Sequence, residues 1–168
     1  NRMSSTRRPL IAGNWKMNGL VADGKALASA LAEKRSNAGD VAFDMLVCPP
    51  FTLVSTIGGV VSGSGISFGA QDCHTAEAGA HTGDISPAML KDLGCEFVIV
   101  GHSERRTDHG ETDDLVRAKV EAAIAAGLKA VICIGETEAE RDAGKTFDVV
   151  RTQVQGSVPA VASAVNSV

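Results

Sequence analysis

The stretch that decides the fold is CEFVIVGHSERR, residues 95–106. Its first half is one of the most apolar short runs in the chain, which is typical of a strand buried on both faces of a parallel sheet. The chain then turns polar at once, with His102, Ser103, Glu104 and two arginines. Because ionisable groups near a buried strand are costly unless they have partners, this junction predicts a functional site at a strand end.

Four other strand-like runs accompany this one, at residues 9–15, 44–50, 66–71 and 129–136. Helical patterns separate them, at residues 18–39, 52–65, 86–94 and 111–127, and a further helix opens at the capping box TEAE, residues 137–140. Ser86 followed by Pro87 is an N-cap signal, and Gly127 is placed to end the fourth helix. Five βα units of about 30 residues each predict an α/β fold with a parallel sheet and right-handed crossovers.

Two architectures compete for five such units. An open doubly wound sheet is complete with five strands, whereas a (β/α)8 barrel typically needs about 250 residues, so length alone favours the open sheet. In an open sheet only the strand ends at the switch point need special residues, but in a barrel every strand end faces one mouth. Here all five strand ends carry polar or turn-forming residues: Asn14-Trp15-Lys16, Pro49-Pro50, Gln71-Asp72, His102-Ser103-Glu104 and Gly135-Glu136. This pattern favours a barrel, or part of one.

The composition fits one domain and argues against several functions. The 168 residues are 44% hydrophobic and 21% charged, which is enough for a domain with its own core. The net charge of −4 argues against a nucleic-acid binder, and no apolar stretch has the length of a membrane span. None of the four cysteines forms a C-x-x-C pair, which favours reduced thiols and a cytoplasmic protein. Residues 1–8 are interpreted as a disordered tail or cloning remnant, and residues 9–168 as the domain.

Two strand-end side chains are candidates for the chemistry. Lys16 follows the first strand, where a fixed cation would suit a phosphate or carboxylate, although a lone lysine is more often an ordinary surface residue. His102 could be a hydrogen-bonded core histidine. If a short helix starts at Ser103, however, its N-terminal dipole disfavours the imidazolium, and a neutral ring can donate a hydrogen bond to a developing enolate. Glu104 is expected to pair with Lys16, and the two arginines are expected to form a solvated salt-bridge cluster.

Several motifs, in this order and at these spacings, resemble the triosephosphate isomerase family from about residue 8 onward: AGNWKMN (12–18), GAQD (69–72), GAHTGDIS (79–86), VIVGHSERR (98–106) and CIGE (133–136). The resemblance implies a TIM barrel, a (β/α)8 fold that about five βα units represent here. Matched by motif, Asn14 and Lys16 resemble the family's substrate-binding pair, Lys16 its active-site cation and His102 its catalytic electrophile. The supporting positions matched in the same way are Ser103, Glu104, Cys133 and Glu136.

The resemblance implies interconversion of dihydroxyacetone phosphate and D-glyceraldehyde 3-phosphate through an enediolate, as in glycolysis and gluconeogenesis. It implies a homodimer and no metal or organic cofactor. Thr82 and Gly83, in the loop at residues 72–86, resemble the tip of the family's interdigitating dimer loop. The expected partners are therefore a small phosphorylated triose and a second copy of the chain, with no nucleic acid and no membrane. The alternative is a non-catalytic α/β binding or scaffold paralogue, which needs no base.

The sequence departs from the family pattern in one respect. The family's base is a glutamate at the end of the sixth strand, and the printed sequence stops at AVNSV, residues 164–168, where that strand would begin. We therefore expect the 168-residue chain to be inactive by itself. This ending leaves three possibilities open: the chain is a proteolytic fragment, a partial record of a longer chain, or a genuine short paralogue.

Overall fold

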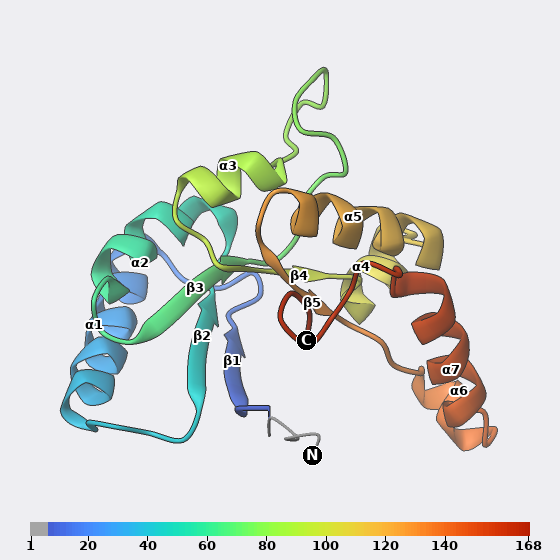
Figure 1. Ribbon diagram of the computed structural model, residues 1–168, viewed down its shortest axis with the longest axis horizontal. Helices are drawn as coiled ribbons and strands as arrows, with labels where there is room; N and C mark the ends of the chain where they lie inside the picture. Colours follow the sequence, from blue (N-terminus) through green and yellow to red (C-terminus); the bar gives the residue numbers. More distant parts are fainter. Residues whose placement is uncertain (1–6) are drawn as a thin grey trace, which may run out of the picture.

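The computed structural model describes residues 7–168, and the five expected strands form one parallel sheet in the order β1-β2-β3-β4-β5. The strands are β1 (Leu10–Asn14), β2 (Asp44–Cys48), β3 (Ile66–Ala70), β4 (Phe97–Val100) and β5 (Lys129–Ile132). An open doubly wound sheet would reverse its strand order at a switch point. The sequential order and the curvature of the sheet (Figure 1) are those of a partial barrel, so this prediction is confirmed.

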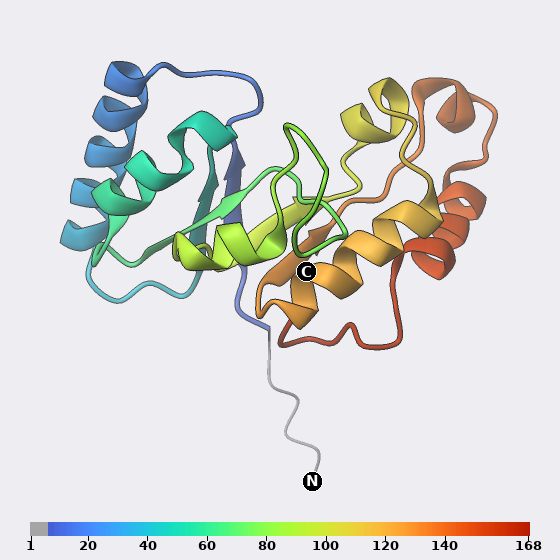
Figure 2. The ribbon, with the colours of Figure 1, turned by 90° about the horizontal axis from the view of Figure 1, so that it is seen from above.

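The helices lie in an arc along the convex side of the sheet, as Figures 1 and 2 show. They are α1 (Val21–Asn37), α2 (Val54–Val61) after a 3-10 turn η1 (Phe51–Leu53), α3 (Pro87–Asp92), α4 (Ser103–Asp108), α5 (Asp113–Ala125), α6 (Glu138–Asp142) and α7 (Thr146–Ser157). The predicted caps are confirmed: the Ser86 hydroxyl accepts the first-turn N–H of Met89 at 3.2 Å, and Thr137 and Glu140 form the capping box. None of the helices between residues 7 and 168 has the length and apolar character of a bilayer-crossing segment.

The sheet is packed on both faces, but unevenly. On the convex face, Val98 and Val100 of β4 join a core with Val116 and Val120 of α5. On the concave face, Leu46, Cys48, Phe97 and Ile99 form a smaller cluster. Strand β4 is therefore buried on both faces, as its apolar run predicts.

Strand β1 is less buried than β4. Ile11, in the middle of this strand, is 55% exposed, and three of the five β1 residues are exposed. Strand β1 pairs only with β2 and lies at the edge of the sheet. An apolar run indicates a strand buried on both faces only where other elements cover both faces, and Ile11 belongs to none of the three buried core clusters.

The other edge of the sheet is partly covered by the end of the chain. The N–H of Ala130 donates to the carbonyl of Asn166 at 3.0 Å, and the N–H of Val168 donates to the carbonyl of Ala130 at 2.9 Å. Ser167 forms a parallel bridge with Ala130. Residues 166–168 therefore run beside β5 in the place that a sixth strand would take, as the motif order predicts.

The predicted N-terminal tail falls mostly outside the described residues, which begin at Arg7. Arg7 donates to the carbonyls of Ala164 and Ser167. Arg8 pairs with Asp44 at 3.0 Å and also donates to backbone carbonyls just before β2. Arg7 and Arg8 are thus held against the domain.

Candidate active site at the strand ends

Lys16 follows the end of β1 in an unusual backbone conformation. Its φ of 54° makes it the one non-glycine residue between 7 and 168 in the left-handed region. This conformation costs an L-residue about 1–2 kcal/mol, and such strain persists only where the surroundings hold it. The Lys16 N–H donates to Asn14 Oδ1 at 2.9 Å, and its carbonyl accepts from Gln71 Nε2 at 2.8 Å. The backbone of Lys16 is therefore held on both sides.

The Lys16 side chain is paired as predicted. Its Nζ lies 2.6 Å from Glu104 Oε1, which joins the end of β1 to the first turn of α4. Hydrogen bonding to Lys16 lowers the pKa of Glu104 below its ordinary value. Both side chains are about half exposed, at 51% each, so solvent screens the pair and its contribution to stability is small. The pair instead fixes the position of a cation at the mouth of the partial barrel.

His102 is placed by the turn that ends β4. Gly101 has a φ of 69°, and a Cβ there would lie 2.7 Å from Val116 Cγ1, so only glycine fits this turn. His102 then acts as the N-cap of α4, and its Nδ1 accepts the backbone N–H of Glu104 at 3.2 Å. A ring nitrogen that accepts a hydrogen bond carries no proton. A neutral His102 therefore keeps its proton on Nε2 and can donate it to an oxygen atom.

The two arginines of the motif do not form the solvated cluster that we expected. Arg106 has a side chain only 14% exposed, pairs with Asp113 at 2.6 Å and donates to the carbonyls of Gly101 and Cys133. It therefore ties the ends of β4 and β5 together from behind the site. Arg105 also points away from Lys16, toward carboxylates at the base of the long loop.

Those carboxylates belong to a buried ionic network that the sequence did not predict. Lys119, on α5, binds Asp72 at 2.8 Å and also binds Glu111, and Arg105 reaches the same two carboxylates at 3.0 and 2.8 Å. The Glu111 side chain is only 2% exposed and that of Lys119 only 7%. This network anchors the loop that begins at Asp72 to α4 and α5.

The remaining positions matched by motif are near the strand ends, but among the described residues their side chains make no hydrogen bond or ion pair with Lys16 or His102. Ser103 is the exposed first residue of α4. Cys133 is half-buried beyond β5, and its N–H donates to the carbonyl of Val100 at 2.9 Å. Glu136 accepts from Arg141 at 2.8 Å, and this bond lowers the pKa of Glu136. Within residues 7–168, no hydrogen bond or ion pair connects Glu136 with the Lys16–Glu104–His102 group.

The cysteines are free thiols, as predicted. Cys48, Cys73 and Cys95 are buried and Cys133 is half-buried. Burial raises the pKa of Cys48 and Cys73 to about 12 and that of Cys95 to about 11. Thiols with such a raised pKa are poor nucleophiles, so none of these three is a candidate for covalent chemistry.

The loop at residues 72–86 projects beyond the helical layer (Figure 1), and residues 77–84 are exposed. Thr82 and Gly83 lie in this exposed part. The N–H of His74 closes the neck of the loop by donating to the carbonyl of Ile85 at 2.8 Å. The loop is therefore held in one shape at its base while its tip remains free to contact another surface.

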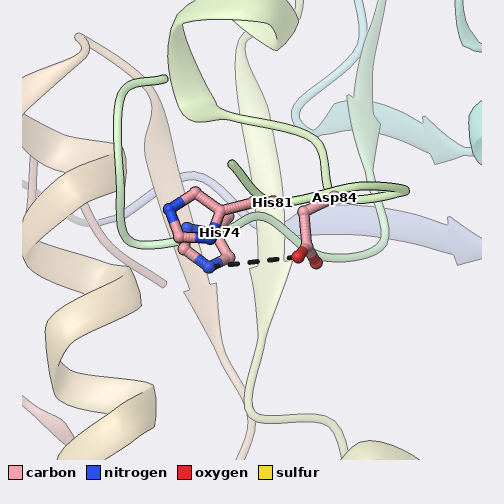
Figure 3. A group of neighbouring side chains, drawn as sticks. All are labelled: His74, His81 and Asp84. Carbon is pink, nitrogen blue, oxygen red and sulfur yellow. Dashed lines mark ion pairs between the residues drawn. The ribbon is translucent and has the colours of Figure 1, made fainter. Parts of the chain in front are cut away.

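Figure 3 shows three side chains of this loop, His74, His81 and Asp84, whose polar atoms lie within 4.8 Å of one another. His74 Nδ1 accepts the backbone N–H of Ala76 at 2.9 Å, so a neutral His74 carries its proton on Nε2, which faces Asp84 at 4.0 Å. A metal-binding histidine instead donates through one nitrogen and binds the ion through the other. The donor pattern therefore fits a contact that shapes the loop better than a metal site.

Two features of the site escaped the sequence analysis. Gln71 was recognised only as a polar residue at a strand end, and its bond to the Lys16 carbonyl carries no local signal. The buried network of Lys119, Asp72 and Glu111 spans three separate segments. The one available hint is that a lysine stands within the apolar face of α5, between Val116 and Val120.

Comparison with known proteins places these features in one family. The model of the triosephosphate isomerase family matches residues 9–168. Triosephosphate isomerase of Gluconacetobacter diazotrophicus is 55% identical over 127 residues, which cover 76% of this chain and 51% of that protein. The enzyme of Afipia carboxidovorans is 57% identical over 129 residues, covering 76% and 50%. The crystal structure of triosephosphate isomerase from Bartonella henselae matches with a TM-score of 0.86 and 45% identity, over 96% of this chain and 66% of that one. The chain thus spans about half the length of these curated relatives.

Proposed function

The chain belongs to the triosephosphate isomerase family, and on this premise we propose that the protein containing it interconverts dihydroxyacetone phosphate and D-glyceraldehyde 3-phosphate. The observation that carries the proposal is the grouping of Lys16, Glu104 and His102 at the C-terminal ends of β1 and β4. It combines a cation held in place by Glu104 with a hydrogen-bond donor, the Nε2–H of His102. These are the two groups that an anionic carbonyl substrate requires at its reacting end.

In the proposed reaction a base removes a proton from the carbon beside the substrate carbonyl. The C–H electrons form a C=C bond, and the carbonyl electrons move onto oxygen. The Nε2–H of His102 would donate to that oxygen as its negative charge grows, and Lys16 would balance the charge of substrate and enediolate. A proton then moves from the neighbouring hydroxyl to that oxygen. Returning the abstracted proton to the former carbonyl carbon, as the former hydroxyl oxygen becomes the new carbonyl, completes the isomerisation.

Glu104 is poorly suited to be the base. Its lowered pKa weakens it as a proton acceptor, and one of its oxygens is already bound to Lys16. The family resemblance assigns the base to a glutamate of the sixth strand, and no glutamate of residues 9–168 matches that motif. We therefore propose that the 168-residue chain alone has no isomerase activity above background.

A graft tests this function directly. Residues 9–160 replace the corresponding N-terminal part of the Gluconacetobacter diazotrophicus relative, and the rest of that relative supplies the remaining strands. We expect the chimera to isomerise glyceraldehyde 3-phosphate in a coupled assay, and the same chimera with Lys16→Met to lose most of that activity. A folded, inactive chimera would contradict the proposal, because the family barrel would then be complete and still lack chemistry.

We also propose that the whole protein is a cytoplasmic homodimer that works in glycolysis and gluconeogenesis. The support for the dimer is the loop at residues 72–86: a hydrogen bond between His74 and Ile85 closes its base, and its exposed part includes the small residues Ala78, Gly79, Ala80 and Gly83. Met17, beside Lys16, is 95% exposed. Leu20 and Val21, close by in the chain, are 77% and 53% exposed, and a group of exposed apolar side chains next to the site suits a contact with a second copy.

A further inference from the structure

The side chain of Gln71 contacts the ends of two neighbouring strands. It directly follows β3 and is half-buried. Its side-chain Nε2 donates to the carbonyl of Lys16 at 2.8 Å and to the carbonyl of Cys48 at 2.9 Å. Both partners are carbonyl oxygens, which only accept hydrogen bonds, so the NH2 group of the amide must face them. One side chain thus joins the ends of β1, β2 and β3.

The contact to Lys16 matters because of the backbone conformation there. On the N–H side Lys16 is held within its own segment, by Asn14 Oδ1. On the carbonyl side, the bond from Gln71 is the one hydrogen bond that the structure of residues 7–168 provides. A non-glycine residue stays in the left-handed region only where its surroundings hold it. Removal of the Gln71 bond would free the peptide after Lys16 to rotate toward an ordinary conformation.

We propose that Gln71 is a positioning residue for Lys16: its amide holds the peptide plane after Lys16 and so fixes where Nζ lies. The direction of the Lys16 side chain follows from the φ and ψ of its backbone. The same amide bond to Cys48 ties this geometry to the buried end of β2 rather than to the exposed edge strand β1. Gln71 does not touch the proposed substrate and acts only through Lys16.

The inference rests on the proposed function only for its kinetic consequence, so the main test does not use activity. In the full-length protein, Gln71→Met removes both donors at nearly constant size, and Gln71→Glu places an acceptor against two carbonyls. The matched control is Gln155→Met, an exposed glutamine on α7. Two readouts report on Lys16: the hydrogen-exchange rate of its amide, and the NMR titration of the Glu104 carboxyl that its Nζ contacts.

In both Gln71 variants we expect the Lys16 amide to exchange at least tenfold faster and the pKa of Glu104 to move up, toward its value in Lys16→Met. The control should match the wild type in both readouts. Unchanged amide exchange and Glu104 titration in folded Gln71→Met would overturn the inference. If Gln71→Met does not fold, the same two readouts in Gln71→Glu decide.

Measurements of kcat/KM distinguish a failure of the role of Gln71 from a failure of the proposed function. If both are right, Gln71→Met lowers kcat/KM by about tenfold or more, and Lys16→Met with Gln71→Met is no worse than Lys16→Met alone, because the two residues act as one unit. A full additional tenfold loss in the double variant would contradict action through Lys16. If the protein has no isomerase activity at all, the proposed function fails while the exchange and titration results still decide the role of Gln71.

Discussion

Replacing Lys119 with methionine should reveal how much the buried ionic network contributes to stability. Methionine keeps nearly the same length as lysine and therefore leaves no large cavity on the inner face of α5. What it removes is the cation shared by Asp72 and Glu111. The two carboxylates would then share only Arg105, whose side chain is 31% exposed. The variant therefore isolates the electrostatic part of the network.

The expected loss has a lower and an upper bound. Removing one partner of a buried ion pair typically costs about 3–5 kcal/mol, because the remaining charge stays buried. The folded variant can escape part of this cost by protonating one carboxyl. From an ordinary pKa near 4.3, protonation at about pH 7.5 costs about 4 kcal/mol, which limits the loss. Since Arg105 still compensates one carboxylate, we expect the free energy of unfolding to fall by about 3 kcal/mol at about pH 7.5.

The pH dependence gives a second, sharper expectation. In the wild type, burial raises the pKa of Glu111, but hydrogen bonds from Lys119 and Arg105 outweigh it and the net pKa is lowered. The stability that Glu111 contributes is therefore present above its unfolded pKa and lost as the pH falls below it. For Asp72, burial outweighs Lys119 and the net pKa is raised. Its ionised form therefore opposes folding, and acidification relieves this cost.

Without Lys119, the pKa values of Asp72 and Glu111 should both rise. The free energy of unfolding of the variant should therefore increase relative to that of the wild type as the pH falls. The gain is at most about 1.4 kcal/mol per pH unit for one carboxyl that is protonated only in the folded state. Urea unfolding of the two proteins at about pH 5.5, 6.5 and 7.5 should therefore show a deficit that shrinks with acidification. Lys25→Met, at an exposed position of α1, is the control. A deficit below about 1 kcal/mol at every pH, or one that grows on acidification, would refute the reasoning.

Three further substitutions, each made in the full-length protein, test the site and the loop. Lys16→Ala should lower kcat/KM by at least about 100-fold with the circular dichroism spectrum unchanged, because the charge of the substrate loses its partner; near-normal turnover would remove Lys16 from the mechanism. His102→Gln should lower kcat more than it raises KM, since the oxygen charge develops only in the transition state; a change in KM alone would make His102 a binding residue. Thr82→Arg should give monomers by sedimentation and lower activity together, and a fully active dimer would show that the loop tip lies outside the interface.

The sequence predicted the elements whose signals are local. All five strands and the caps at Ser86 and Thr137 lie where the patterns place them, because turn geometry and capping depend on neighbouring residues. The pairing of Lys16 with Glu104 was also predictable. Both residues follow parallel strands, and the ends of such strands meet at the same edge of the sheet.

What the sequence did not predict depends on contacts across the chain. The exposure of Ile11 depends on which elements cover its face of β1, and a run of apolar residues carries no such information. The partners of Lys119 come from two other segments. The sequence also gives no sign of the left-handed backbone of Lys16. Lysine has no preference for that region, and hydrogen bonds with Asn14 and Gln71 hold it there.

The arginines of GHSERR show why a polar motif need not be polar surface. Successive residues of a helix point about 100° apart, so a short helix that begins at Ser103 cannot turn all its side chains toward one site. Glu104 reaches the cation at Lys16, whereas Arg105 and Arg106 point to the opposite side and bind buried carboxylates and the carbonyls that end β4 and β5. The density of charge at this strand end therefore has two causes. One group of side chains forms the candidate active site, and the other fixes the turn at Gly101 from which His102 and Glu104 are presented.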